Sequence, residues 1–268
     1  MISVPRIAAS SYSNTAPLVW SFLYGSLRGS AELIMDTAPA RSAELLAGGR
    51  VDAALVPVFS YQTISNVRLI PNVCVGAKER VRSVCLVTKG CDLADVRNVA
   101  LDVSSRTSAA LTKIIFREFI GREPFWIDAA PNIDEMLVGA DCALLIGDPS
   151  LRIPNEKNGD DGSLRKFDLV ELWRENTGLG FVFAMWMTRA SASPLDFAAA
   201  RDEGVAHIDE IAANYTDQIG IGAADLVDYL GRSISYSVSD EMSAGLELYF
   251  KLANKHGLIE RNLPLQFV

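Results

Sequence analysis

Short apolar runs alternate along the chain with segments in which apolar residues recur at helical spacing. Four of these runs, at 6–9, 53–56, 99–101 and 143–146, consist almost entirely of Ala, Val, Leu and Ile. Strands with this composition are buried on both faces, so helices must cover both sides of their sheet. The pattern therefore predicts an α/β fold built on mostly parallel sheets.

The segment after Thr107 has the clearest helical pattern. Its large apolar side chains recur at helical spacing, at Leu111, Ile114, Ile115 and Phe119. Lys113, Arg117 and Glu118 take the opposite face, as in a helix that covers a core. Gly121 stands where a left-handed cap would end such a helix.

Two stretches ninety residues apart, 49–56 and 139–146, resemble each other. In each, a helical pattern ends near a glycine, an Asp follows, and a buried strand begins. One copy is a common α/β turn, whereas two copies indicate two similar lobes, each with its own sheet.

Two long, apolar, β-prone segments, 81–88 and 181–187, are candidates for the crossings between the lobes. They predict a discontinuous first lobe, residues 1–86 and 187–268, with residues 87–186 inserted as the second lobe. A cleft between the lobes is expected in this architecture.

The chain from Pro194 onward is predicted to be helical and to pack on the first lobe. Ser237, three residues before Asp240, offers an amino-terminal cap for the last helix. Leu246, Tyr249 and Ala253 form its apolar stripe.

Composition narrows the classes of partner. The 268 residues are 49% hydrophobic and carry a formal net charge of −8, which opposes nonspecific binding to nucleic acid or anionic lipid. The amino terminus has no secretory pattern, and no apolar stretch approaches the ~20 residues of a membrane span. We therefore expect a cytoplasmic protein without nucleic-acid or membrane partners. The oligomeric state stays open.

Cysteine and histidine usage gives no sign of a metal centre. The four cysteines lack CxxC spacing and mostly lie in apolar surroundings, so buried thiols are expected. His207 and His256 are the only histidines, which excludes a site built on several of them. The sequence also lacks a Gly-rich phosphate motif and a Ser-His-Asp set.

The strongest local feature is the loop 104–108, Ser-Ser-Arg-Thr-Ser, between a predicted strand and the helix after Thr107. The first turn of a helix exposes unpaired N–H donors and a partial positive charge. One Ser would be enough to cap the helix, yet here five donor-capable residues follow one another. The loop therefore favours anion binding, with Ser105, Arg106, Thr107 and Ser108 as the candidate ligands.

A second polar turn, 10–15, follows the first strand and precedes Pro17. Ligands bind at such strand ends in open parallel sheets, so Asn14 in this turn is a candidate site residue. A helix cap by Asn14 or Thr15 is an equally good explanation. Ser83, in a predicted crossing strand, reads as structural when taken alone.

Two further turns could line the same cleft. Gly147 and Asp148 end the strand at 143–146, and Thr177 lies in the turn that leads to the 181–187 strand. Asp148 could orient a donor or take part in proton transfer, although an Asp before a proline is more often structural.

Several segments, taken in order, resemble the chorismate dehydratase family of the futalosine route to menaquinone. They are Ser13-Asn-Thr-Ala-Pro-Leu18, Asp52-Ala-Ala-Leu-Val-Pro57, Val81-Arg-Ser-Val84, Leu101-Asp-Val-Ser-Ser-Arg-Thr-Ser108, Leu144-Leu-Ile-Gly-Asp148, Asp168-Leu through Trp173, and Thr177-Gly-Leu-Gly-Phe-Val-Phe-Ala-Met-Trp186. The resemblance spans nearly the whole chain. It implies the fold of type II periplasmic binding proteins.

The resemblance also implies an activity. Chorismate, a dicarboxylate, loses water to give 3-[(1-carboxyvinyl)oxy]benzoate, without a metal or organic cofactor. Asn14 and Ser83 would then lie beside the reacting ring, while the residues of the 105–108 loop hold a carboxylate. Gly147, Asp148 and Thr177 would complete the binding site.

The chain departs from the family pattern at 78–80, where Lys-Glu-Arg replaces a small residue, glycine and proline, at Pro149, and at Gly180. Three other functions stay possible: a 1,4-dihydroxy-6-naphthoate synthase-like enzyme of the same route, a noncatalytic small-anion-binding protein, and the sensor domain of a transcription factor. The first would be expected to use a histidine base, the second an export signal, and the third a helix-turn-helix segment.

Overall fold

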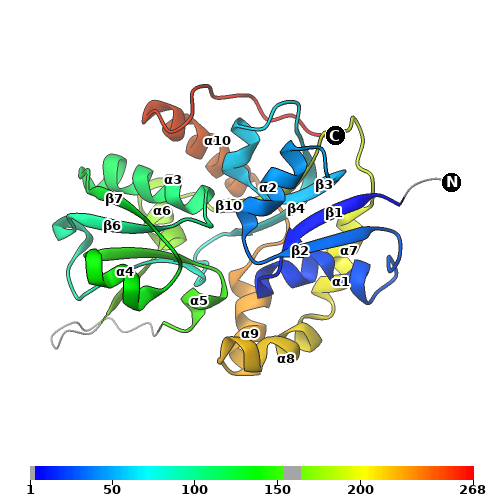
Figure 1. Cartoon of the computed structure of the whole chain (residues 1–268), viewed down its shortest axis with the longest axis horizontal. Helices are drawn as coiled ribbons and strands as arrows, with labels where there is room; N and C mark the ends of the chain where they lie inside the picture. Colours follow the sequence, from blue (N-terminus) through cyan, green and yellow to red (C-terminus); the bar gives the residue numbers. More distant parts are fainter. Residues whose placement is uncertain (1–3, 154–163) are drawn as a thin grey trace.

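The computed structural model describes residues 4–153 and 164–268, which contain two five-stranded sheets (Figure 1). The first sheet has the order β2 (Glu32–Asp36), β1 (Arg6–Ser10), β3 (Ala53–Pro57), β10 (Phe181–Thr188) and β4 (Arg68–Ala77). The second has the order β7 (Phe125–Ala129), β6 (Asn98–Asp102), β8 (Cys142–Ile146), β5 (Val84–Thr88) and β9 (Arg165–Asp168).

The two sheets share one topology. β1 pairs in parallel with β2 and β3, as β6 does with β7 and β8. One strand of each sheet is reversed: β10 is antiparallel to β3 and β4, and β5 to β8 and β9. The two similar sequence stretches end in β3 and β8, which hold the same third place in their sheets. The predicted α/β class is confirmed.

The reversed strands lie in the two predicted crossing segments. The chain leaves the first sheet after Ala77 and returns to it at Phe181. We call the first sheet with its helices lobe 1 and the second lobe 2. The predicted boundaries 86/87 and 186/187 fall inside β5 and β10, and the division of the chain into folding units at those points stays a prediction.

Helices cover both sheets (Figure 1). The α-helices are α1 (Ala16–Leu23), α2 (Pro39–Ala47), α3 (Thr107–Ile114), α4 (Ile133–Gly139), α5 (Asp148–Leu151), α6 (Leu169–Thr177), α7 (Phe197–Val205), α8 (Ile208–Ile219), α9 (Ala223–Asp228) and α10 (Asp240–Lys255). Short 3-10 helices are η1 (Ser13–Thr15), η2 (Val58–Gln62) and η3 (Leu93–Asp95), and π-helical turns are η4 (Ile115–Ile120) and η5 (Tyr229–Ser233).

The helix predicted after Thr107 is present, but its second half is the π-helical turn η4. A wider turn changes which side chains face the core. Phe116 is consequently buried, whereas Phe119, which the 3.6-residue pattern placed on the buried face, is only half-buried. Gly121 ends the segment in the left-handed conformation, as predicted.

The carboxy-terminal helix α10 packs on β10 of lobe 1 (Figure 1). The predicted stripe Leu246, Tyr249 and Ala253 is buried, and the ring of Tyr249 meets that of Phe181 edge-on at 5.2 Å between centroids. The amino-terminal cap is Ser239, which accepts from Met242 N–H, so the prediction of Ser237 was wrong.

The four cysteines are free thiols. Cys74, Cys85 and Cys142 are buried, as expected, and Cys91 is half-buried. Burial raises the pKa of Cys74 to about 12 and that of Cys85 to about 11, because a thiolate is poorly solvated in the core. Among the described residues, no helix is both long and apolar enough to cross a membrane.

Candidate functional site

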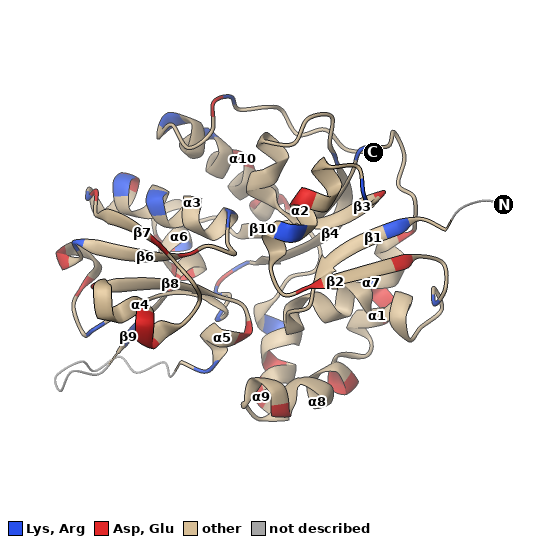
Figure 2. Ribbon diagram, in the orientation of Figure 1, with Lys and Arg blue, Asp and Glu red and all other residues tan. Residues whose placement is uncertain are grey.

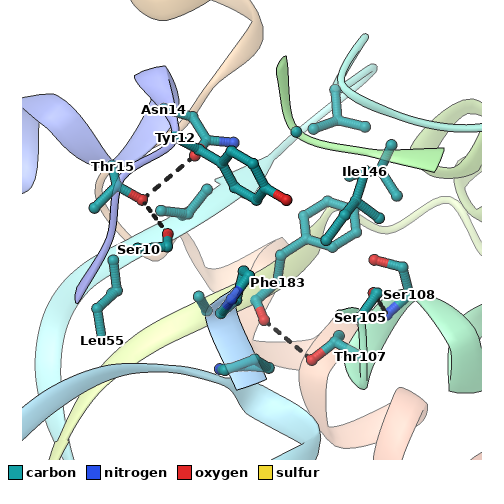
Figure 3. A pocket seen from close by; sticks show the side chains of 17 residues that line it. Ser10, Tyr12, Asn14, Thr15, Leu55, Ser105, Thr107, Ser108, Ile146 and Phe183 are labelled. Atoms are coloured by element: carbon teal, nitrogen blue, oxygen red, sulfur yellow. Dashed lines mark hydrogen bonds between the residues drawn. The ribbon is translucent and has the colours of Figure 1, made fainter. Parts of the chain in front are cut away.

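A cavity lies where the carboxyl ends of strands from both sheets meet (Figure 3). It has about 70 Å³ of free volume. Its lining consists of Ser10, Tyr12, Asn14, Thr15, Pro39, Leu55, Pro57, Val75, Val81, Val84, Ser105, Thr107, Ser108, Ile146, Gly147, Phe183 and Ala184.

The lobe 1 side of the cavity is built by the turn that follows β1. Ser10 and Thr15 join their hydroxyls at 2.9 Å, and the Thr15 hydroxyl also donates to the Asn14 side-chain oxygen at 3.5 Å. Asn14 is 9% exposed and lines the cavity. The predicted site residue Asn14 therefore lies at the cavity, with its side-chain oxygen bonded within the same turn.

The lobe 2 side is built by the equivalent turn, which follows β6. Ser105 and Ser108 both line the cavity, and the Ser105 hydroxyl accepts from Ser108 N–H at 3.2 Å. Its proton is left to donate elsewhere. The first turn of α3 thus presents the Ser105 and Ser108 side chains to the cavity from the side opposite Asn14 (Figure 3), and the helix terminus adds a partial positive charge.

Thr107 has a different role in this turn. Its hydroxyl donates to Phe183 O at 3.2 Å and accepts from Phe59 N–H at 3.2 Å, and both partners belong to lobe 1. Thr107 therefore lines the cavity while its hydroxyl joins the two lobes. Ser104, in the same loop, donates to the Asp102 carboxylate through its N–H at 2.8 Å and its hydroxyl at 2.6 Å.

Four predicted site residues do not line the cavity: Ser83, Arg106, Asp148 and Thr177. The Thr177 hydroxyl donates to Trp173 O at 2.8 Å and accepts from Leu179 N–H, which completes the end of α6. Arg106 lies at the start of α3 with its guanidinium 3.8 Å from Glu44 of α2, an ion pair between the lobes.

Asp148 joins the lobes behind the cavity. Its carboxylate accepts from Ser13 N–H at 3.2 and 3.1 Å and from the Ser13 hydroxyl at 2.5 Å. It caps the first turn of η1, which has no side-chain cap of its own. Burial raises the pKa of Asp148, and the hydrogen bonds from Ser13 oppose that rise.

Ser83 lies one layer further in and is fully buried. Its carbonyl oxygen accepts from Gly147 N–H at 2.7 Å, so it supports a cavity residue through the backbone. Gly147 has φ 67° and ψ −153°, a conformation open essentially to glycine alone. A side chain there would also meet the Tyr12 ring at 2.8 Å.

Tyr12 is the main lining residue that the sequence did not single out. It extends from lobe 1 with its ring against Gly147 of lobe 2. Burial raises the pKa of Tyr12, because a phenolate is poorly solvated there. The sequence offers one signal for this residue, its place in the polar turn 10–15. An aromatic side chain is more typical of the core, so its type does not indicate a cavity residue.

The cavity wall carries no formal positive charge. Among the described residues, no Lys, Arg or His lines it. Figure 2 shows Lys and Arg scattered over both lobes among Asp and Glu. An anion in this cavity would therefore be held by hydroxyls and by helix-terminal N–H groups. The described residues bring no three His, Cys, Asp or Glu side chains together in a way that could hold a metal ion.

Comparison with known proteins places this geometry in a family. The family model described as menaquinone biosynthesis matches residues 5–255. The chain belongs to the menaquinone biosynthesis family. A chorismate dehydratase from Thermus thermophilus is 29% identical over 266 residues, which cover 93% of each protein.

Solved structures with the same arrangement support the fold. Protein AF1704 from Archaeoglobus fulgidus has a TM-score of 0.72 at 16% identity, covering 95% of this chain and 98% of its own. The periplasmic aliphatic sulphonate binding protein SsuA from Escherichia coli has a TM-score of 0.63 at 14% identity, covering 98% and 93%. The predicted periplasmic-binding-protein-like fold is confirmed.

Proposed function

We propose that this protein is a chorismate dehydratase, which converts chorismate to 3-[(1-carboxyvinyl)oxy]benzoate and water in menaquinone biosynthesis. The family match and the Thermus thermophilus relative support this proposal. The structural observation that carries it is a cavity with hydroxyl groups on opposite sides and an apolar wall between them (Figure 3). The polar groups on its two sides suit the two carboxylates of a small ring.

The reaction consists of the loss of one proton and one hydroxyl group from the substrate ring. The C3 proton of the ring leaves, its electron pair delocalises through the diene toward the ring carboxylate, and the C4 hydroxyl departs as the ring becomes aromatic. An enzyme can accelerate this by fixing the conformer and by stabilising the negative charge that develops.

The start of α3 is the proposed place for the ring carboxylate. Ser105 and Ser108 offer hydroxyls there, and the helix terminus adds a partial positive charge. Phe183, Ile146 and Leu55 form the apolar part of the wall, which keeps water away and strengthens these hydrogen bonds. Charge that builds up on the carboxylate would be stabilised more than the ground state.

Asn14 lies on the other side of the cavity, and its amide cannot act as a strong base. We propose that the enolpyruvyl carboxylate of chorismate itself takes the C3 proton, while Asn14 orients it or the departing hydroxyl. Asn14→Ala should then lower kcat by about 100-fold or more, as loss of a transition-state donor does. Asn14→Asp should also raise KM, because its carboxylate repels the substrate. Steady-state kinetics with turnover unchanged in Asn14→Ala would refute the assignment.

The decisive experiment is to mix the purified protein with chorismate and follow the product by mass spectrometry. We expect a product lighter by one water, formed faster than in a protein-free control and much more slowly with Asn14→Ala. Chorismate recovered unchanged would refute the proposal. Tight binding of another small anion without turnover would instead favour a noncatalytic binding protein.

The proposed mechanism needs no metal or organic cofactor. Turnover after dialysis against a strong chelator should therefore equal turnover before it. A loss of activity that added metal restores would contradict this part of the proposal.

A further inference from the structure

A strained turn lies where the chain first crosses from lobe 1 to lobe 2. It stands between β4 and β5, where Ser83 N–H donates to Val81 O at 2.7 Å around Arg82. We call residues 81–83 the crossing turn. Arg82 has φ 62°, a left-handed conformation that a non-glycine residue adopts only at a cost. Three-residue turns with a positive central φ are rare, and such strain persists where other contacts hold it, most often at functional sites.

The carboxylate of Asp168 holds the crossing turn. Asp168 is the last residue of β9, is 6% exposed, and pairs with Cys85 of β5. Its Oδ2 accepts from Arg82 N–H at 2.6 Å and from Val81 N–H at 3.0 Å. Two successive N–H groups thus converge on one carboxylate oxygen, in hydrogen bonds that the negative charge strengthens.

The other oxygen of Asp168 caps a helix. Oδ1 accepts from Val170 N–H at 2.9 Å and from Glu171 N–H at 3.3 Å, both in the first turn of α6. It also lies 3.2 Å from the nitrogen of Val81. A single short side-chain oxygen is enough to cap a helix. The two functions of Asp168 can therefore be separated by substitution.

Two further contacts bind the crossing turn to both lobes. The guanidinium of Arg82 pairs with Asp225 at 2.7 Å and with Asp228 at 3.5 Å, both in α9. The carbonyl oxygen of Arg82 accepts from the hydroxyl of Ser150, in α5, at 3.4 Å. The position of the turn is thus determined from several sides at once.

Hydrogen bonds connect the crossing turn to the candidate site. The carbonyl oxygen of Ser83 accepts from Gly147 N–H at 2.7 Å, and Gly147 lines the cavity. The next residue, Asp148, accepts from the N–H and the hydroxyl of Ser13. Ser13 directly precedes Asn14. A continuous series of contacts therefore leads from the crossing turn to the turn that carries Asn14.

We propose that Asp168 is a positioning residue for the dehydration of chorismate, whose carboxylate holds the crossing turn and thereby places Asn14. The inference rests on the proposed function. Asp168 is not among the described residues that line the cavity, so it acts through residues that are, Val81 and Gly147. Without the carboxylate, Arg82 relaxes toward an ordinary backbone conformation, and the cavity wall shifts with it.

Asp168→Ser is the test, because serine caps helices about as well as aspartate but has only one short oxygen. Its hydroxyl can serve the first turn of α6, whereas the N–H groups of the crossing turn lose their carboxylate. We expect kcat to fall by about 10- to 100-fold, the size of effect that a misplaced catalytic group produces. KM should change by less than about threefold, because the carboxylate donors of α3 are untouched. Steady-state kinetics well below the Tm of the variant separate this loss from a loss of folded protein.

Asp196→Ser is the matched control. Asp196 is the amino-terminal cap of α7, and in the described chain its side chain accepts only from Ala199 N–H of its own helix. This variant should keep the wild-type kcat and KM. A wild-type kcat for folded Asp168→Ser as well would reduce Asp168 to a helix cap, which overturns the inference and leaves the dehydratase proposal intact.

A pair of substitutions at Arg82 tests the route of the effect. Arg82→Gly and Arg82→Ala remove the same guanidinium, but only glycine adopts φ 62° without strain. When each is combined with Asp168→Ser, the variant with Arg82→Gly should have a kcat about fivefold or more above that with Arg82→Ala. Equal kcat values in the two double variants would overturn the crossing turn as the route.

Asp168→Thr is the second variant if Asp168→Ser does not fold, since threonine also caps helices and fills more of the space. If neither folds, Asp168 is required for the fold itself, and the positioning role is refuted. A wild-type protein that does not dehydrate chorismate would overturn both this inference and the proposed function.

Discussion

At the scale of single residues, Arg106 and Ser108 of the 105–108 loop differ in what their side chains contact. Arg106 carries the only formal charge in the 105–108 loop, yet its guanidinium lies by Glu44 outside the cavity. Ser108 is uncharged and lines the cavity. If direct hydrogen bonds hold the carboxylate, the serine should matter more than the arginine.

Two variants test this order. Ser108→Ala should lower kcat/KM by about 10- to 100-fold, as expected for loss of a hydrogen bond to a charged group. Arg106→Ala should lower it less than about fivefold, because the guanidinium is partly exposed and its field is screened by salt. Measuring kcat/KM of both variants at low and high ionic strength separates the loss of a direct hydrogen bond from the loss of long-range electrostatic attraction. A larger loss for Arg106→Ala would place the guanidinium on the substrate.

At the scale of elements, six of the ten described strands, the helix after Thr107, the carboxy-terminal helix and the loops after β1 and β6 follow from the hydrophobic pattern. Three details do not. The π-helical turn η4 has the same sequence period as an α-helix, Ser237 and Ser239 are equally good caps, and Tyr12 resembles a core residue. In each case, contacts with other elements decide between local alternatives of similar energy, and one sequence does not contain those contacts.

Close packing of α10 against the start of β10 requires glycine at 245. A Cβ there would overlap the carbonyl oxygen of Gly180. Gly245→Ala should therefore destabilise the protein by about 1–3 kcal/mol, the usual cost of overpacking. Gly139→Ala is the control, since a Cβ at that helical position meets no atom within 4 Å. It should be neutral or stabilise by up to about 1 kcal/mol. Urea unfolding of both variants distinguishes packing from helix propensity; equal effects would contradict the packing argument.

Glu123, just before β7, forms an ion pair with Arg117 of η4. Arg117 holds its carboxylate through Nε at 2.5 Å and Nη2 at 2.8 Å, which lowers the pKa of Glu123 to about 2. A lowered pKa stabilises the fold above the unfolded value of about 4.3, and this contribution disappears as pH falls toward 2.

Glu123→Gln should therefore cost stability at pH 7 and progressively less as pH falls below 5. The side chain of Glu123 is 54% exposed, so the cost at pH 7 should stay under about 1 kcal/mol. Urea unfolding at pH 7, 5, 4 and 3 measures it, with the exposed Glu175→Gln as a control. A difference in the free energy of unfolding between wild type and Glu123→Gln that stays constant across this pH range would contradict the role of the charge.

At the scale of the whole molecule, polar ties join the two lobes around the cavity, beside an apolar core that both lobes share. Thr107 joins α3 to Phe183, Arg106 joins it to Glu44, and Asp148 joins lobe 2 to Ser13. Polar ties can exchange with water, so they suit a cleft that must open for substrate and product. Thr107, Arg106 and Asp148, which the sequence predicts as ligands, instead join the lobes around the cavity.

Among these three contacts, loss of Asp148 should lower kcat/KM the most. It is buried, and its carboxylate accepts both the N–H and the hydroxyl of Ser13, the residue before Asn14. Asp148→Ala should lower kcat/KM by about 100-fold, because the turn that carries Asn14 loses its cap and the closed cleft is less populated. Ser13→Ala should cost less, since the backbone N–H still bonds to Asp148. Small-angle scattering should show a larger radius of gyration for Asp148→Ala than for the exposed control Asp95→Ala. Wild-type dimensions together with wild-type kcat/KM would rule out this coupling between lobe closure and the site.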